Sequence, residues 1–256
     1  MPVIDDQIHT LAKWIAESKK IVGFTGAGIS TESGLSDFTG KDGVWTRRTK
    51  GLPIKDPKVT LEDAKPNRTH YALVELQELG KLKFLISQNV DNLHLISGIH
   101  PDKLAEIHGN DTLLICTNCQ KKVTKNEVNW NIGLHGFGFS FEDESELPER
   151  RPRCPKCGGN LLSTVINYRD PLPEKEYNDS VKHSKDCDLF IVLGSSLITT
   201  PANKMPIFAL NAGAKLVIVN GSKTKLDDKA HLKITADVGD VMERALKEAK
   251  QLIHKS

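Results

Sequence analysis

Four of the five cysteines in this 256-residue sequence form two Cys-x-x-Cys pairs, Cys116 with Cys119 and Cys154 with Cys157. A Cys-x-x-Cys turn places two thiolates about one tetrahedral edge apart, so two such turns supply the four sulfurs of a zinc site. A site closed by four thiolates has no open coordination position, which predicts a structural rather than a catalytic zinc ion. The 34-residue spacer exceeds the usual ~15–20 residues, and its glycines and acidic run predict a loop insertion. The fifth cysteine, Cys187, precedes an apolar strand and is predicted to be a core thiol.

A glycine-containing turn follows the first predicted strand, at Gly26-Ala27-Gly28-Ile29-Ser30. Glycines at this position let the backbone approach a pyrophosphate, whose charge is met by backbone amides. The spacing departs from the dehydrogenase pattern Gly-x-Gly-x-x-Gly because position 31 is threonine, and no strand-end acidic residue stands out about 20 residues further on to bind a ribose. The turn alone therefore leaves two interpretations open, a dinucleotide-binding loop or an ordinary tight strand-to-helix turn.

Further polar or glycine clusters follow other predicted strands. Residues 88–94 (Gln-Asn-Val-Asp-Asn-Leu-His) come after one strand, Gly194-Ser195-Ser196 after a second, and Asn220 after a third. Open α/β sheets bind ligands at the carboxyl ends of their strands, so these residues converge on a candidate site. His108 is a candidate general base because the pKa of imidazole lies near working pH. Each feature alone also fits a helix-capping turn or an ordinary histidine, but capping does not explain the convergence.

Apolar periodicity predicts the elements that position these residues. Helical spacing is found at 8–16, from about 68 to 80, at 103–107, from Thr200-Pro201 to Gly213, and from about 237 onward; short apolar strands are predicted at 21–25, 83–87, 189–193 and 215–219. This alternation predicts an α/β fold with a doubly wound parallel sheet. Because residues 113–161 interrupt the alternation, we expect a large domain of residues 1–112 and 162–256 and an inserted small zinc-binding domain of residues 113–161.

The composition excludes several classes of protein. The 28.3 kDa chain has 35 Lys and Arg against 33 Asp and Glu, a formal net charge of +2, which argues against a protein that coats nucleic acid. No apolar run approaches the roughly 18 residues that a membrane span needs, and the first residues lack the features of a signal peptide. We therefore expect an intracellular protein with no membrane contact and no direct nucleic-acid motif.

The ordered set of motifs resembles the sirtuin family. The resemblance rests on residues 26–30 and 33–38, residues 88–94, His108-Gly109, the two cysteine pairs, Gly194-Ser195-Ser196 and Val219-Asn220, which span nearly the whole chain. Residues 43–46, 103–110 and 170–173 resemble the nuclear sirtuin-six and sirtuin-seven branch in particular. The resemblance implies a Rossmann-type sheet domain with an inserted zinc-ribbon domain, and the activity of an NAD-dependent protein lysine deacylase.

The resemblance also implies NAD as cosubstrate, one structural zinc ion and a role for individual residues. His108 would be the base that removes a proton from a ribose hydroxyl, Asn89 and Asp91 would complete the catalytic set, and the products would be free lysine, nicotinamide and O-acyl-ADP-ribose. The partner would be a protein with acylated lysines, with histones as the candidate substrate. The implied cofactor-binding residues are Gly26, Ala27, Gly28, Thr31, Asp37, Phe38, Trp45, Gln88, Asn89, Asp91, His108, Gly194, Ser195, Ser196, Asn220, Ser222 and Val238, and the implied metal ligands are Cys116, Cys119, Cys154 and Cys157.

One departure from the family pattern keeps other functions open. The chain reads Ser36-Asp37-Phe38-Thr39 where the family has Pro-Asp-Phe-Arg. Loss of the arginine removes a charge-assisted contact of about 1.5–3 kcal/mol, so we expect weak acetyl-lysine turnover or an altered acyl preference. The alternatives are a protein mono-ADP-ribosyltransferase and a weakly active NAD-binding scaffold. The branch resemblance implies the nucleus as compartment, with the cytoplasm as the alternative.

Overall fold

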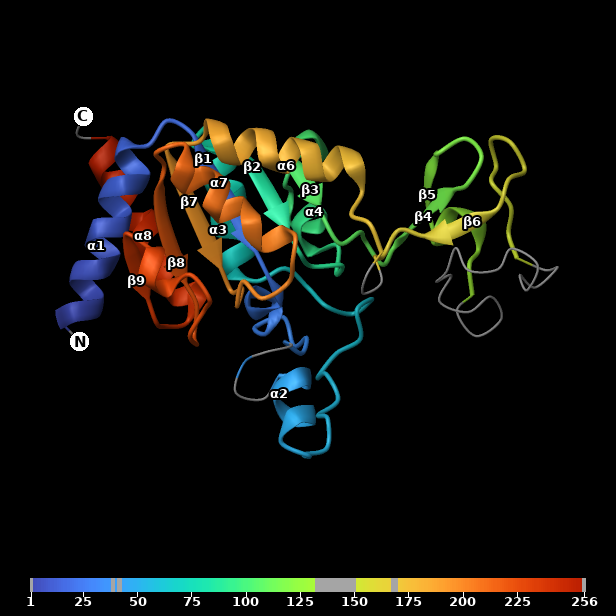
Figure 1. Cartoon of the computed structure of the whole chain (residues 1–256), viewed down its shortest axis with the longest axis horizontal. Coiled ribbons are helices and arrows are strands. Elements are labelled where there is room, and N and C mark those ends of the chain that lie inside the picture. The colour runs from blue at the N-terminus through green and yellow to red at the C-terminus, as the bar shows by residue number, and fades with distance from the viewer. Residues whose placement is uncertain (1, 38–39, 41–42, 132–150, 167–169, 255–256) are drawn as a thin grey trace.

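A six-stranded parallel sheet forms the centre of the molecule (Figure 1). The structure, a computed structural model, describes residues 2–37, 40, 43–131, 151–166 and 170–254. The strands follow the spatial order β3-β2-β1-β7-β8-β9. Their bounds are β1 Ile21–Thr25, β2 Leu82–Ser87, β3 Leu104–Glu106, β7 Leu189–Leu193, β8 Lys215–Val219 and β9 Leu232–Ile234. The predicted doubly wound parallel sheet is confirmed.

Helices cover both faces of this sheet. The helices α1 (Pro2–Glu17), α3 (Arg68–Glu78) and α8 (Val238–Ile253) share one apolar cluster with the sheet, whereas α6 (Glu174–Asp186) and α7 (Met205–Asn211) share the other. Two shorter helices, α2 (Val44–Thr49) and α4 (Leu93–Ser97), follow β1 and β2 in the chain. Among the helices of the described residues, none has the length and apolar character needed to cross a membrane.

The continuous apolar runs of the central strands follow from this two-sided burial. Side chains alternate along a strand, and in β7 Phe190 and Val192 pack into the α6/α7 cluster while Ile191 and Leu193 pack into the α1/α3/α8 cluster. The rings of Phe24 and Phe190, on neighbouring strands, have centroids 6.1 Å apart. Both faces therefore need apolar residues, so apolar and polar residues do not alternate along β7.

A second, three-stranded antiparallel sheet lies beside the first along the long axis of the molecule (Figure 1). Its strands are β4 (Leu113–Cys116), β5 (Lys122–Thr124) and β6 (Leu161–Ser163), in the order β5-β4-β6. Leu114, Val123, Trp130 and Leu161 form a small apolar core together with the buried cysteines.

One of the expected helical segments is wrong, and another begins later than expected. Residues 103–107 were expected to be helical, but a 3₁₀ turn at Pro101–Lys103 leads into the edge strand β3, where Ala105 pairs with Ile86. The strand wins because Ala105 and Ile107 both point into the α6/α7 cluster, the alternation that a strand provides. The helix expected from Thr200-Pro201 begins later, at Met205, after a 3₁₀ turn at Ala202–Lys204.

We predict that Phe190→Ala lowers the free energy of unfolding by about 3–5 kcal/mol, because it removes a fully buried ring and leaves a cavity in the α6/α7 cluster. The matched control is Tyr71→Ala, since Tyr71 on α3 is 54% exposed and we expect a change within about 0.5 kcal/mol. Urea unfolding followed by circular dichroism measures both. Equal losses for the two variants would contradict this assignment of the core.

Candidate active site and metal centre

Four loops meet at the carboxyl edge of the six-stranded sheet. They follow β1, β2, β7 and β8, and they contain the residue clusters 26–30, 88–92, 194–196 and 220–222. The strand order reverses between β1 and β7, since β2 and β3 lie on one side of β1 and β7, β8 and β9 on the other. Doubly wound sheets bind ligands at such a reversal, and the loops after β1 and β7 flank it.

Glycine backbones pack directly against one another at this reversal. The Gly26 N–H donates to Leu193 O (3.1 Å) and the Gly28 N–H donates to Gly194 O (2.9 Å). A Cβ at Gly28 would lie 2.7 Å from Gly194 O, and a Cβ at Gly194, where φ is +61°, would lie 2.5 Å from the backbone nitrogen of Ile29. The glycines are therefore required by loop-to-loop contact, which also keeps side chains off the backbone that faces the edge.

A buried polar network links the loops after β1 and β2. Ser30 Oγ donates to Asp91 Oδ2 (2.6 Å), and Asn89 Nδ2 donates to Ser30 Oγ (3.1 Å). Burial raises the pKa of Asp91, and the hydrogen bond from Ser30 opposes that rise. Gln88 Nε2 reaches across to Ser195 Oγ (2.7 Å) in the loop after β7. Asn89 Oδ1 is buried without a hydrogen-bond partner among the described residues, so it is available to a ligand that carries a donor.

His108 presents an unprotonated ring nitrogen beside this network. His108 Nδ1 lies 3.2 Å from Gln88 O, and a carbonyl oxygen only accepts, so Nδ1 carries the proton. In the neutral ring the lone pair is then on Nε2, which is buried and has no partner in the described part of the chain. Burial lowers the pKa of His108 below its ordinary value of 6.5. The imidazole is therefore neutral at pH 7 and has the tautomer that a general base at Nε2 requires.

The other predicted cofactor residues lie in the loops after β1, β7 and β8 and at the start of α8. Asn220 Nδ2 donates to Ser222 O (3.0 Å) and to Ser222 Oγ (3.2 Å), and Val238 is the first residue of α8. Ser196 O accepts from Lys225 N–H, and the exposed Thr31 donates through Oγ1 to Gly28 O (3.0 Å).

The segment after the first loop is only partly described. Asp37 Oδ2 accepts from Gly40 N–H (3.1 Å), a contact within that segment itself. Trp45 is on α2, which projects from the large sheet (Figure 1). Phe38 and Thr39 lie outside the described residues, so the expectation drawn from the missing arginine stays a prediction.

Sequence reasoning assigned no role to Ser30 or to a buried histidine pair. Ser30 is the residue that joins Asn89 to Asp91, and its position at the end of the glycine turn was the available signal. Elsewhere in the large domain, the rings of His70 and His94 lie 5.0 Å apart, and His94 Nε2 is 2.9 Å from Thr25 Oγ1. Burial lowers the pKa of His70 to about 4 and that of His94 well below its ordinary value, so both are neutral. Helical spacing around each gave no hint that they meet.

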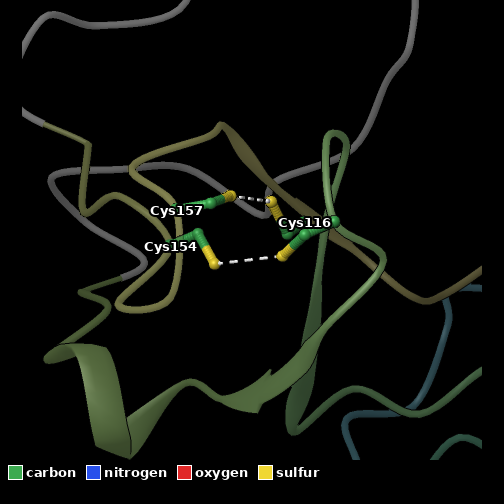
Figure 2. A group of neighbouring side chains, drawn as sticks. Cys116, Cys154 and Cys157 are labelled. Atoms are coloured by element: carbon green, nitrogen blue, oxygen red, sulfur yellow. Dashed lines mark hydrogen bonds between the residues drawn. The ribbon is translucent and has the colours of Figure 1, made fainter.

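The four paired cysteines converge on one point in the small sheet (Figure 2). Their four sulfur atoms all lie within 4.8 Å of one another, with Cys116 Sγ 3.5 Å from Cys157 Sγ and Cys119 Sγ 3.7 Å from Cys154 Sγ. A tetrahedral zinc ion with Zn–S bonds of about 2.3 Å needs sulfurs about 3.8 Å apart, so the donor set fits zinc. The backbone N–H of Cys119 lowers the pKa of Cys116, which favours the thiolate that binds metal.

Tight turns bring the second pair under the first. Cys154 N–H donates to Gly159 O (2.9 Å), and a Cβ at Gly159 would lie 2.9 Å from Cys116 Sγ. Gly158 has φ +73°, a conformation that L side chains rarely adopt. Cys187 is buried in the α6/α7 cluster instead, where burial raises the pKa of its thiol to about 12, as expected for a core thiol.

Comparisons with known proteins agree with this geometry. A protein-family model described as the Sir2 family matches residues 54–201. The "NAD-dependent protein deacetylase SRT1" of Arabidopsis thaliana is 42% identical over 236 residues, which cover 92% of this chain and 48% of the plant protein. The chain thus spans about half the length of that relative. The "NAD-dependent protein deacetylase Sirt6" of Drosophila melanogaster is 35% identical, with 96% of this chain and 76% of the fly protein covered.

A solved structure of Sir2 with a p53 peptide and NAD+ has the same fold. Its TM-score to this chain is 0.73 at 31% sequence identity, and the superposition covers 95% of this chain and 99% of the other. The likeness therefore extends over nearly the whole chain.

We predict that the purified chain contains about one zinc ion and that Cys154→Ser loses it and lowers the thermal unfolding midpoint, because a structural site needs all four thiolates. The matched control is Cys187→Ser, which removes a buried thiol outside the cluster and leaves the zinc content unchanged. Inductively coupled plasma mass spectrometry gives the metal content. A Cys154→Ser variant with full zinc occupancy would rule out the four-thiolate site.

Proposed function

The chain belongs to the Sir2 family, and from this premise we propose that it acts as an NAD-dependent protein lysine deacylase. The observation that carries the proposal is the half-buried His108, whose Nδ1 is bound to Gln88 O and whose buried Nε2 is free to accept a proton. Gln88, whose carbonyl accepts from this base, also donates to Ser195 in the loop after β7, so the base belongs to the same cluster of loops as the glycine-lined strand reversal and the buried Asp91. A zinc scaffold or a simple binding module would not need this arrangement.

The described residues fit the cosubstrate at the carboxyl edge. Bound NAD supplies a glycosidic bond to nicotinamide, a neutral leaving group, and a ribose hydroxyl that accepts the acyl group. The free Asn89 Oδ1 is the acceptor for an amide group of the ligand, and Asp91, fixed by Ser30, lies beside it as a hydroxyl acceptor. His108 Nε2 holds the proton that a hydroxyl gives up during acyl transfer. Asn89 and Asp91 are buried and His108 is half-buried, which limits the access of water to these groups and so limits hydrolysis.

We assign the remaining positions as part of the same proposal. The glycine turns take the diphosphate, and the loops after β7 and β8 with the start of α8 take the adenosine half. Residues 1–112 and 162–256 form the cofactor-binding domain, and residues 113–161 form the inserted zinc domain. These assignments comprise Gly26, Ala27, Gly28, Thr31, Asp37, Phe38 and Trp45 in the first segment, and Gly194, Ser195, Ser196, Asn220, Ser222 and Val238 in the others.

The substrate class proposed is a protein that carries acylated lysines. The Sir2 structure with a p53 peptide and NAD+ supports a peptide substrate, and histones are the candidate protein. The relative named Sirt6 supports the proposed branch. The proposed nuclear location follows from the sequence resemblance to that branch, with the cytoplasm as the alternative. Mono-ADP-ribosyl transfer stays the alternative from the sequence, and no contact among the described residues favours it.

We predict that His108→Ala lowers deacylation by about 10²- to 10⁴-fold, because the proton acceptor at Nε2 is lost. Nicotinamide release, which does not need this base, should fall less. His100→Ala, which removes an exposed histidine, should leave both rates unchanged. Mass spectrometry of NAD with acetyl- and myristoyl-lysine peptides follows nicotinamide, free lysine and O-acyl-ADP-ribose. Nicotinamide release from the wild-type chain without free lysine would replace the deacylase by the ADP-ribosyl transfer alternative.

The same assay should show a pH dependence with a defined sign. A base works when neutral, and the pKa of His108 is lowered from 6.5, so we expect the rate to be at its plateau by neutral pH. The rate should then fall as pH drops through the lowered pKa, with a midpoint below about 6.5. A midpoint well above that value would contradict the role of His108 as the base.

A further inference from the structure

Asn110 is a buried asparagine at the place where the chain passes from the large sheet to the small one. It is only 1% exposed and follows His108-Gly109 directly. Its Oδ1 accepts from Thr112 N–H (2.9 Å) and from Thr112 Oγ1 (2.7 Å). Because a backbone N–H only donates, this contact fixes the orientation of the amide, and the two Nδ2 hydrogens must point the other way.

Those two hydrogens join two segments of the candidate active site. Asn110 Nδ2 donates to Asn92 Oδ1 (2.8 Å) and to Glu106 Oε1 (2.6 Å). Asn92 has φ +64° and follows Asp91, whose Oδ1 accepts from Leu93 N–H (3.0 Å). Glu106 precedes the His108 turn by two residues. The amide thus connects the turn that holds Asp91 with the turn that holds His108.

The backbone of Asn110 is fixed as well, by the segment that returns from the small sheet. Asn110 N–H donates to Thr164 Oγ1 (3.0 Å), and that hydroxyl donates to Asn110 O (2.8 Å). At Gly109, where φ is +83°, a Cβ would lie 1.9 Å from Thr164 O. Ile166 N–H donates to His108 O (3.0 Å). Every polar atom of Asn110 therefore has a hydrogen-bond partner, as a buried asparagine requires. A residue that only linked the two sheets would not need this set of contacts.

We propose that Asn110 is a positioning residue, whose side-chain amide holds the Asp91–Asn92 turn against the Glu106–His108 segment and so sets the spacing of the two catalytic groups. The inference rests on the proposed deacylase function. Asn110 itself does not touch the reacting groups. Its effect is on geometry, and a misplacement of about 1 Å in a catalytic group can cost on the order of 100-fold in rate.

The contact with Glu106 makes the proposal testable by charge. The charged groups facing Glu106 are Asp91 in the loop after β2, Lys122 on β5 and Glu176 on α6, and burial raises the pKa of Glu106 to about 7. In the native protein both forms of Glu106 accept from the Asn110 amide. In Asn110→Asp two carboxyl groups face each other, so they share one proton at low pH and repel when both are ionised.

The experiment compares Asn110→Asp with the exchanged pair Glu106→Gln/Asn110→Asp across pH 6 to 9. We expect Asn110→Asp to lose about tenfold or more in kcat at alkaline pH, with a smaller change in the KM for NAD, and to recover toward acidic pH. In the exchanged pair the amide at position 106 donates to the carboxylate at position 110, and the amide of Asn92, flipped so that its nitrogen takes the place of its oxygen, donates to it as well. Both contacts are thus restored with donor and acceptor exchanged, so the alkaline loss should disappear. Asn178→Asp, the same change at an exposed position of α6, should follow the wild type throughout.

Thermal unfolding separates this proposal from the proposed function. Thermal unfolding of the same variants across the same pH range needs no activity, and Asn110→Asp should lose stability at alkaline pH only, with recovery in the exchanged pair. An inactive wild-type chain would overturn the deacylase proposal while this melting test still decides the contact. An Asn110→Asp profile parallel to the wild type, or an exchanged pair that does not recover kcat, would overturn the positioning role.

Discussion

The rest of the site depends on the contact between the loops after β1 and β7. At the point where the strand order reverses, two backbones approach so closely that Gly28 N–H donates to Gly194 O and a Cβ on either residue would meet the other loop. This contact fixes the spacing of the two loops, and Gln88 Nε2 donates to Ser195 Oγ to join the loop after β2 to the loop after β7. Any residue with a side chain at these glycines would separate the loops and, with them, the donors and acceptors that the site needs.

Burying polar groups at this edge costs free energy because they lose their hydrogen bonds to water. Only a ligand or a complete set of protein partners can offset that cost. The side chains of Ser30, Asn110 and Gln88 form hydrogen bonds to neighbouring polar groups. Asn89 Oδ1 and His108 Nε2, in contrast, have no hydrogen-bond partner in the described structure. Buried polar atoms without partners are rare in folded proteins and concentrate where a ligand completes them. Asn89 Oδ1 and His108 Nε2 are therefore the two atoms at this edge to which the proposed function assigns contacts with a ligand.

Much of this architecture is present in the sequence because its physical causes are local. Continuous apolar runs such as 189–193 require burial on both faces, and the Cys-x-x-Cys turns carry their own geometry, so the sheet and the cysteine cluster could be predicted. The segment 103–107 was assigned wrongly because an alternation as short as Ala105 and Ile107 is not distinguished from helical spacing, and pairing with β2 decides between the two. Ser30, Asn110 and the His70–His94 pair were missed because each acts through a residue distant in the chain. The individual roles of the predicted NAD residues came from resemblance, because no local pattern says which part of a dinucleotide a loop residue contacts.

The insertion of the small sheet also sets the order in which the molecule can be completed during synthesis. The central strand β1 pairs with β2 on one side, but its other neighbour, β7, is synthesised only after the last of the four cysteines has been added. Until residues 189–193 emerge, one edge of β1 has no partner strand and the glycine loop after it has no opposing loop. The metal-binding segment has all its ligands earlier. The nascent chain is therefore able to close its zinc site while the cofactor edge is still incomplete.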